Sequence, residues 1–176
     1  MRRPSSIGQP PAVTAYVALG SNLGDSRAMV QRAIRRLQEL SAQPLRASSL
    51  WQTSPVDCPP GSPPFINAVV ALTPGPTEAP ESLRQKLQAL EVEFGRKPNV
   101  VRNEPRPLDL DLIAFGHERR SSPHLVLPHP RAHQRRFVLA PLAELAPDLV
   151  LPGQSRTARH LLEQLDSSEE VHRLPD

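Results

Sequence analysis

The stretch from residue 96 to 115 constrains the fold most strongly, because it joins a basic loop broken by prolines to a strand with two aspartates. Between residues 108 and 115 apolar and polar side chains alternate with a period of two, which is typical of a half-buried strand. Asp109 and Asp111 therefore project from the same face, roughly 6.6 Å apart along the backbone. We expect the alternate leucines to point the other way, into a core: Leu108, Leu110 and Leu112.

Two carboxylates at this separation can hold one or two divalent cations between them. Mg²⁺ suits such a site because it takes one or two carboxylates, keeps part of its water shell and adds substrate phosphate oxygens. A guanidinium offers a rigid fork of donors that matches phosphate oxygens, and three arginines lie on the loop: Arg96, Arg102 and Arg106. The pattern therefore indicates a polyphosphate held on metal. The alternative is an edge strand with a solvated acidic face, preceded by surface arginines.

Four motifs occur in series along the chain. They are A-Y-V-A-L-G-S-N-L-G-D at residues 15–25, F-I-N-A-V-V-A-L at 65–72, R-N-x-P-R-x-L-D-L-D-L-I at 102–113, and L-P-H-P-R with R-R-F-V-L-A-P-L between 127 and 142. This series resembles the 6-hydroxymethyl-7,8-dihydropterin pyrophosphokinases, enzymes of the folate pathway. Each motif alone is weakly specific, but together they span nearly all of residues 13 to 153.

Hydrophobic periodicity and turn residues predict alternating strands and helices. We expect a strand at 12–19, a helix from Asp25 or Ser26 to about 40, strands at 46–53 and 65–73, a helix at 81–94 closed by Gly95, and the Asp109 strand. This βαββαβ order is that of a ferredoxin-like α+β fold, which the resemblance also implies. Additional C-terminal helices and short strands should follow: an extended piece at 124–127, a helix at 137–145, a strand at 149–151 and a helix at 156–165.

Length and composition favour one soluble domain, which we place at residues 13–166 between flexible tails at 1–12 and 167–176. No run approaches the roughly 18 apolar residues of a membrane span, and the N-terminal segment lacks the apolar stretch of a signal peptide. Cys58 is the only cysteine, which fits a reducing cytoplasm. A net charge of +3 without a dense basic stripe argues against nucleic-acid binding. We expect a cytoplasmic monomer that binds small molecules.

The resemblance implies a transfer of diphosphate from ATP to the hydroxymethyl group of 6-hydroxymethyl-7,8-dihydropterin, with release of AMP. Such a transfer depends on positioning and charge neutralisation more than on a protein nucleophile. Asp109 and Asp111 would bind two Mg²⁺ ions, while Arg96 and Arg106 would close over the phosphates. The resemblance places further nucleotide contacts at Gln88, Glu91, Leu112, His129 and Arg135.

The pterin side can be considered from chemistry, because a flat bicyclic ring with an amide-like edge favours an aromatic sandwich and a carboxamide partner. Phe65 and Phe137 are candidates for the sandwich, the alternative being two core phenylalanines. Asn67 shares a strand face with Phe65, and an inward amide needs hydrogen-bond partners that a pterin edge would supply. The resemblance adds contacts at the start of the proline-rich loop: Thr53, Ser54 and Val56.

Three surface segments allow a choice between a binding role and a simple connection. The turn at residues 20–24 is glycine-rich but lacks the spacing of a phosphate-binding loop, so we interpret it as a tight connection in which Ser21 and Asn22 satisfy backbone groups. The proline-rich segment at 54–64 must lie on the surface, and the resemblance implies a mobile substrate loop there. The loop after Arg96 should be mobile in the free protein and ordered over bound substrates.

The chain departs from the family pattern at three loop positions. Glu104 stands where a small residue is usual, Pro98 replaces a frequent basic residue, and Asp57 takes a place that is often glycine. The rival function is a binding module, since ferredoxin-like domains include RNA-recognition and regulatory ligand-binding domains. With aromatic residues at 3%, the chain lacks the stacking platform of an RNA-recognition sheet. A regulatory domain could keep both aspartates without turnover.

Overall fold

The computed structural model describes residues 11–98 and 101–176. The strands are β1 (Ala15–Ser21), β2 (Arg46–Ala47), β3 (Trp51–Thr53), β4 (Phe65–Leu72), β5 (Asp109–Phe115), β6 (Arg120–Ser121), β7 (Val126–Leu127) and β8 (Val171–Arg173). The helices are α1 (Ser26–Leu37), α2 (Pro80–Glu93), α3 (Arg136–Leu145) and α4 (Ala158–Gln164), with short 3-10 turns at Gln38–Leu40 and Ala132–Gln134. Six strands form an antiparallel sheet in the order β5-β1-β4-β3-β8, with β2 also paired to β4, and β6 and β7 form a separate hairpin.

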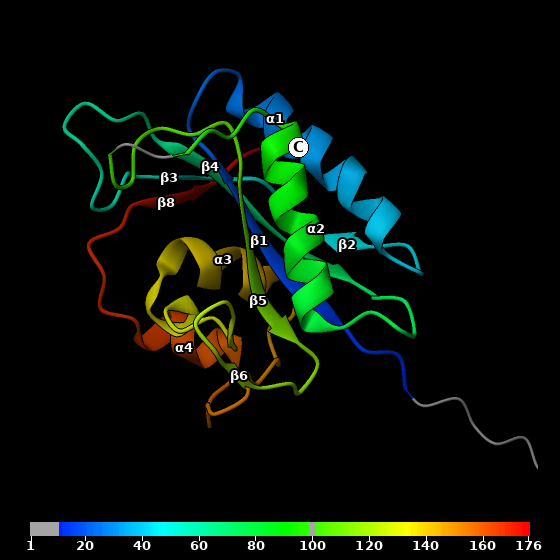
Figure 1. The fold of residues 1–176 in the computed structure, drawn as a ribbon. Helices are drawn as coiled ribbons and strands as arrows, with labels where there is room; N and C mark the ends of the chain where they lie inside the picture. Colours follow the sequence, from blue (N-terminus) through cyan, green and yellow to red (C-terminus); the bar gives the residue numbers. More distant parts are fainter. Residues whose placement is uncertain (1–10, 99–100) are drawn as a thin grey trace, which may run out of the picture.

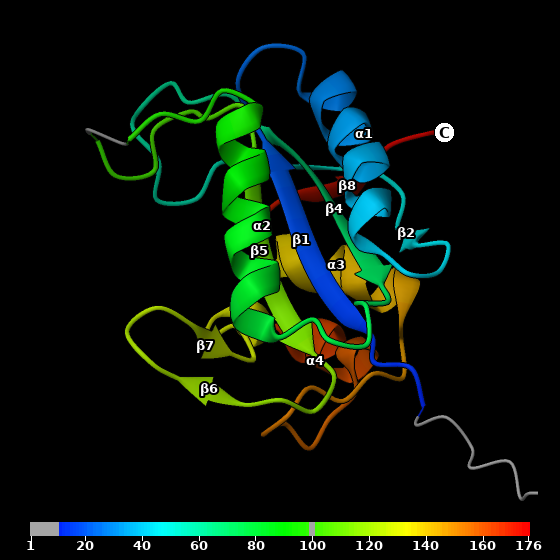
Figure 2. The same cartoon turned by 45° about the vertical axis from the view of Figure 1, so that its right-hand side comes forward.

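The topology confirms the predicted ferredoxin-like α+β fold. β1 lies between β4 and β5, α1 connects β1 to the edge formed by β2 and β3, and α2 connects β4 to β5. Helices α1 and α2 lie side by side on one face of the sheet, whereas α3 and α4 lie on the other (Figures 1 and 2). None of the helices within the described ranges is long and apolar enough to cross a membrane.

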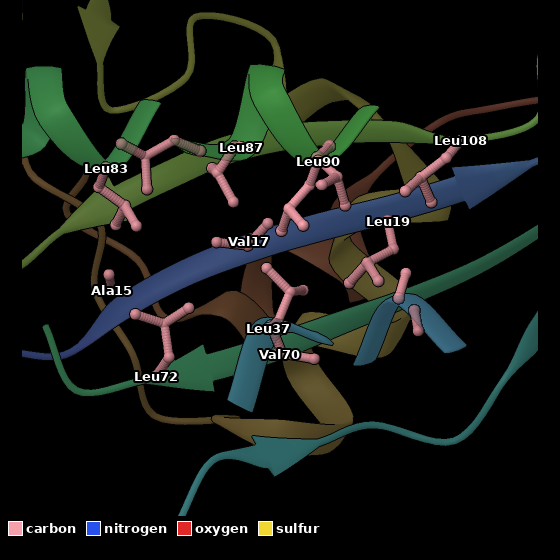
Figure 3. Packing of buried hydrophobic residues seen from close by; sticks show 14 of the residues in the cluster. Ala15, Val17, Leu19, Leu37, Val70, Leu72, Leu83, Leu87, Leu90 and Leu108 are labelled. Carbon is pink, nitrogen blue, oxygen red and sulfur yellow. The ribbon is translucent and has the colours of Figure 1, made fainter. Parts of the chain in front are cut away.

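The sheet face beneath α1 and α2 is filled with aliphatic side chains (Figure 3). Leu83, Leu87 and Leu90 recur at helical spacing on α2 and are buried against the strands. The leucines of the Asp109 strand are buried in the same core, as predicted: Leu108, Leu110 and Leu112. Because side chains alternate along a strand, this burial forces Asp109 and Asp111 onto the opposite face of the sheet.

The opposite face is covered only in part. Val138 and Leu142 of α3 join Val69 of β4 and Ile113 of β5 in a second apolar cluster. Toward the start of β5 the same face carries small and polar residues that border a cavity: Ala18, Gly20, Asn67, Asp109 and Asp111. The candidate site therefore lies where the apolar cluster under α3 ends.

Several element ends follow the sequence signals. Asp25 caps α1, because its carboxylate accepts a hydrogen bond from the backbone N of Ala28 at 3.1 Å. The helix ends at Leu37 and continues as a 3-10 turn to Leu40, which is where the predicted helix ends. Beyond α2, Gly95 adopts a φ of 95°, a left-handed conformation that terminates helices and favours glycine.

The predicted strand at 46–53 is interrupted between β2 and β3. Over this interval the edge strand has one residue more than β4 opposite, which makes a β-bulge. The hydroxyl of Ser48 accepts a hydrogen bond from the backbone N of Val69 at 3.0 Å. This side-chain contact takes the place of a regular ladder bond, and a period-two pattern does not reveal it.

Two predictions for the C-terminal part are wrong. Residues 149–151 form an irregular segment rather than a strand, held where Leu149 O accepts from Ala158 N at 2.8 Å. Residues 167–176, expected to be a flexible tail, contain β8, which pairs with the backbone of β3 at the sheet edge. Their polar sequence has no apolar period that would predict a strand. Of the expected N-terminal tail, residues 1–10 lie outside the described residues.

Candidate active site

Asp109 and Asp111 stand at the start of β5, half-buried, beside Gly20 and Ala18 of β1. Burial and the negative charge of Asp109 raise the pKa of the Asp111 carboxyl to about 6, against an opposing effect of nearby arginines. Two cavities of about 390 and 380 Å³ meet at this pair, because both aspartates border each cavity. An acidic pair on a shared border can act on two different ligands at once.

The donor set at this pair fits a cation that keeps ligands from outside the protein. Within residues 11–98 and 101–176, no group of three or more His, Cys, Asp or Glu side chains could hold a metal ion. Asp109 is engaged by two arginines, with Arg96 Nη1 at 2.7 Å from Oδ1 and Arg106 Nη1 at 3.6 Å from Oδ2. A cation here would replace the close Arg96 contact and complete its shell with water and phosphate oxygens.

The first cavity contains every residue predicted to bind the pterin. They are Thr53, Ser54, Val56, Phe65, Asn67 and Phe137. Gly20 is required at this point of β1, since a Cβ there would lie 2.9 Å from Asn67 Nδ2 and 3.5 Å from the Phe65 ring. The glycine that precedes S-N-L-G-D thus lets the amide and the ring approach the sheet.

Asn67 is already hydrogen-bonded within the protein. Its Oδ1 accepts from Thr53 Oγ1 at 2.7 Å, and its Nδ2 donates to Leu19 O at 3.3 Å. The inward amide therefore does not need a ligand for its satisfaction, contrary to the expectation from the strand pattern. One N–H and one lone pair remain free in principle for a ligand edge, because a carboxamide has two of each.

The second cavity contains five of the seven residues predicted to contact the nucleotide: Gln88, Glu91, Arg96, Leu112 and His129. The other two, Arg106 and Arg135, border the first cavity near the aspartates instead. The segment at residues 122–126, which contains the start of β7, forms the remaining wall of the second cavity. Sequence reasoning did not assign this wall, since short exposed segments carry little periodicity.

Glu91 differs most from its expected setting as a helical surface glutamate. It is only 8% exposed, and its Oε1 accepts from Leu110 N and from Arg96 Nη1, both at 2.7 Å. Burial raises the pKa of its carboxyl to about 7. Glu91 thereby connects α2 to the start of β5 and holds Arg96 beside the aspartates.

Arg96 begins the basic loop in a defined position. Its backbone N donates to Glu91 O at 2.9 Å, and its Nη1 lies 2.7 Å from both Glu91 Oε1 and Asp109 Oδ1. In this structure the guanidinium therefore neutralises the carboxylates. Residues 99–100 of the loop predicted to be mobile lie outside the described residues.

His129 is held as a neutral imidazole with one donor free. Its Nδ1 accepts from Arg131 N at 3.2 Å, and its backbone N donates to Ile113 O at 2.8 Å. Burial, followed by the charges of Arg135 and Arg131, lowers the pKa of His129 to about 4. Since Nδ1 accepts, Nε2 carries the proton and can donate to a phosphate oxygen.

The glycine-rich turn joins the two loops that flank the first cavity. Asn22 Nδ2 donates to Pro63 O at 3.3 Å, and its Oδ1 accepts from Arg106 N at 3.0 Å. This agrees with the interpretation that Asn22 satisfies backbone groups, whereas Ser21 Oγ is buried without a partner among the described residues. Asn22 therefore fixes where Arg106 enters the site.

The proline-rich loop and the basic loop also contact each other directly and run side by side in both views (Figures 1 and 2). Asn103 Nδ2 donates to Asp57 O at 2.9 Å. Asp57 has a φ of 52°, which explains why glycine is common at its place, since aspartate tolerates this left-handed conformation better than most residues. Glu104 borders neither of the two cavities but a third hollow near Phe94, so its carboxylate leaves the phosphate region clear.

The sequence matches the model of the 7,8-dihydro-6-hydroxymethylpterin-pyrophosphokinase (HPPK) family over residues 16–147. A protein of Pseudomonas aeruginosa named 2-amino-4-hydroxy-6-hydroxymethyldihydropteridine pyrophosphokinase is 43% identical over 91% of this chain and 96% of its own length. A protein of the same name from Synechocystis is 40% identical over 86% of this chain and 76% of its own length.

Solved structures of similar fold include Plasmodium falciparum HPPK-DHPS, wild type with pteroate, with a TM-score of 0.64 at 12% identity. An HPPK-DHPS in complex with substrates gives a TM-score of 0.68 at 11% identity. The match covers 89% and 88% of this chain but only 43% of each of those chains. This chain therefore spans less than half of those longer proteins, and at this identity the likeness concerns the fold alone.

Proposed function

Since the chain belongs to the 7,8-dihydro-6-hydroxymethylpterin-pyrophosphokinase family, an ATP-dependent transferase family of folate biosynthesis, we propose how its two cavities divide the substrates. The enzyme transfers diphosphate from ATP to the hydroxymethyl group of the dihydropterin and releases AMP. We assign the pterin to the cavity between Phe65 and Phe137, and ATP to the cavity beside Gln88 and Glu91. The shared border at the aspartate pair supports this assignment most strongly.

The shared border suits the reaction because both reacting atoms must meet there. The pterin hydroxyl oxygen forms a bond to the β-phosphorus of ATP, and the bond from that phosphorus to the α–β bridging oxygen breaks. A pterin stacked beside Phe137 can direct its hydroxymethyl group toward Asp111, while a triphosphate in the second cavity reaches Asp109. Holding both groups in line supplies much of the acceleration in such transfers.

Asp109 and Asp111 would hold the Mg²⁺ ions, for which we propose a number of two. Bound Mg²⁺ supplies neutralisation of phosphate charge, and the raised pKa of Asp111 reflects how poorly the two carboxylates tolerate each other unaided. Each carboxylate can serve one ion on its own cavity side, because the pair borders both cavities.

The basic residues would hold the phosphates from several directions. Arg96 would exchange its contact with Asp109 for a phosphate oxygen when a cation takes that carboxylate, while Glu91 keeps the guanidinium nearby. Arg106 and Arg135 stand on the pterin side of the aspartates, where charge develops during transfer. Neutral His129 would donate from Nε2, and donors fixed before the reaction cost no rearrangement during it.

We also propose that the protein acts as a monomer in the cytoplasm. Both cavities are bordered by residues of a single chain, so a second copy is not needed to complete either wall. The proposed location depends on the lone Cys58, which fits a reducing compartment.

The test is to mix the protein with ATP, Mg²⁺ and 6-hydroxymethyl-7,8-dihydropterin and to separate the nucleotide products. We expect AMP and the pterin diphosphate in equal amounts, and neither product when a chelator removes Mg²⁺. ADP in place of AMP would indicate transfer of a single phosphoryl group. Tight binding of both substrates without any product would instead identify a regulatory binding domain.

A further inference from the structure

The segment from residue 165 to 174, which we call the C-terminal strap, continues the chain from α4 to the sheet edge. Figure 1 shows it passing from α4 to β8, which lies beside β3. Ser54 and Glu170 are joined by two hydrogen bonds, Ser54 N to Glu170 O at 3.0 Å and Glu170 N to Ser54 Oγ at 3.1 Å. Since Ser54 borders the pterin cavity, the strap holds one wall of that cavity.

The strap also holds the opposite wall, at the N-terminus of α3. The backbone N of Phe137 donates to Glu169 Oε2 at 3.2 Å, and Arg136 Nη2 donates to Leu165 O at 2.9 Å. The first N–H groups of a helix have no partner within the helix, and a side-chain oxygen at the N-cap usually supplies one. Arg135 occupies the N-cap of α3 and makes no capping bond, because a guanidinium has no acceptor. Glu169 takes over this role from a distant part of the sequence.

Two further features place Glu169 in the cavity rather than merely near it. Glu169 itself borders the cavity, together with Phe137 and Arg135. Its negative charge lies at the positive end of the α3 dipole, which favours this position. Consecutive residues, Glu169 and Glu170, therefore join the two walls between which the ring would lie, and they set the separation of those walls.

We propose that Glu169 is a positioning residue for the pterin, which acts by capping α3 and so fixing Phe137. The proposal rests on the assignment of the pterin to this cavity. Without the carboxylate, the first turn of α3 loses its cap and the Phe137 ring loses its fixed distance from the opposite wall. The nucleotide cavity is bordered by α2, β5 and residues 122–130 and has no contact with the strap, so the effect should be confined to the pterin.

The experiment compares Glu169→Ala, Glu169→Gln and Glu170→Ala in the full-length protein. Calorimetric titration measures the Kd of 6-hydroxymethyl-7,8-dihydropterin in the presence of Mg²⁺ and a non-hydrolysable ATP analogue, and separately the Kd of the analogue. Glu169→Ala should raise the pterin Kd roughly fivefold, which corresponds to the loss of one helix cap, and should leave the analogue Kd within about twofold. Glu169→Gln should restore most of the affinity, because an amide oxygen can still accept from Phe137 N.

Glu170→Ala is the matched control, since the hydrogen bonds of Glu170 to Ser54 use its backbone; its pterin Kd should equal that of the wild type. Amide hydrogen exchange gives an independent measurement, in which Glu169→Ala should speed the exchange of the first turn of α3. A pterin Kd unchanged in Glu169→Ala, equal losses for both ligands, or a loss in Glu169→Gln as large as in Glu169→Ala would overturn the proposal. A wild-type protein that binds no pterin would instead overturn the assignment of the cavity.

Discussion

The two cavities that meet at the aspartate pair are built in different ways. The pterin cavity is bordered by residues of the sheet, and its amide, Asn67, is fixed by hydrogen bonds to Thr53 and Leu19. The nucleotide cavity is bordered by the exposed side of α2, the start of β5 and residues 122–130, and its charged groups pair with one another. There Arg96 bridges Glu91 and Asp109.

This difference suggests different roles in catalysis. Groups held by a sheet and by internal hydrogen bonds are already in their binding positions, so altering them should change affinity. Groups that pair with one another before the phosphates arrive must exchange partners, so altering them should change the rate of transfer more than ground-state binding. The following predictions test this division, from the largest expected effect to the smallest.

The largest effect should come from the shared border. Asp109→Asn and Asp111→Asn should each lower AMP formation by roughly 10³-fold or more, because each removes charge that holds metal against the phosphates. The fold should persist, since both side chains are only half-buried at a cavity. Steady-state product analysis measures the rate and circular dichroism the fold, with the exposed Asp148→Asn as control. AMP formation within tenfold of the wild type would remove the pair from the mechanism.

Arg96→Ala should lower kcat by roughly 10²–10³-fold, the usual loss of one donor to developing charge, and change the ATP Kd little. Its guanidinium is paired with carboxylates in the free protein, so its contact with phosphate is gained during the reaction. Single-turnover kinetics with a separately measured ATP affinity distinguishes the two. The neighbouring exposed Lys97→Ala is the control. If affinity fell as far as rate, Arg96 would be a ground-state clamp and both cavities would behave alike.

Asn67→Ala should weaken pterin binding by roughly 1–3 kcal/mol, the cost of an unpaired buried group, with ATP binding almost unchanged. Thr53→Val removes the donor to Asn67 Oδ1 but keeps the amide, so its effect on pterin affinity should be smaller. Calorimetry on both variants, with exposed Gln52→Ala as control, measures the affinities. Equal losses for pterin and ATP would show that Asn67 serves the sheet rather than the ligand.

The smallest effect concerns His129, whose pKa in the folded protein is about 4 rather than its usual 6.5. Between these values the unfolded chain binds more protons than the folded one, so stability should fall as the pH drops through this range. For a partly exposed group we expect a loss of roughly 1 kcal/mol between pH 7 and pH 5. Urea unfolding of wild type and His129→Gln at both pH values measures it, with exposed His160→Gln as control. Identical pH dependence in wild type and His129→Gln would contradict a buried neutral imidazole.

Local patterns determined most of the fold. Period-two alternation located the Asp109 strand and its inward leucines, and helical spacing located α1 and α2 with ends near Asp25 and Gly95. These signals suffice because burying one face of a strand or helix depends on residues close together in sequence. The same alternation placed both carboxylates on one face, and the motif resemblance named residues that border the two cavities.

Contacts between distant segments were decided only by the tertiary structure. The polar segment around Glu169 has no period of its own, and it is ordered because β3 offers a free edge and α3 an uncapped end. The burial of Glu91 follows from the packing of α2 beside β5 rather than from its place on a helix. Partners separated by many residues leave no local pattern, because their hydrogen bonds form only after the sheet and helices have been assembled.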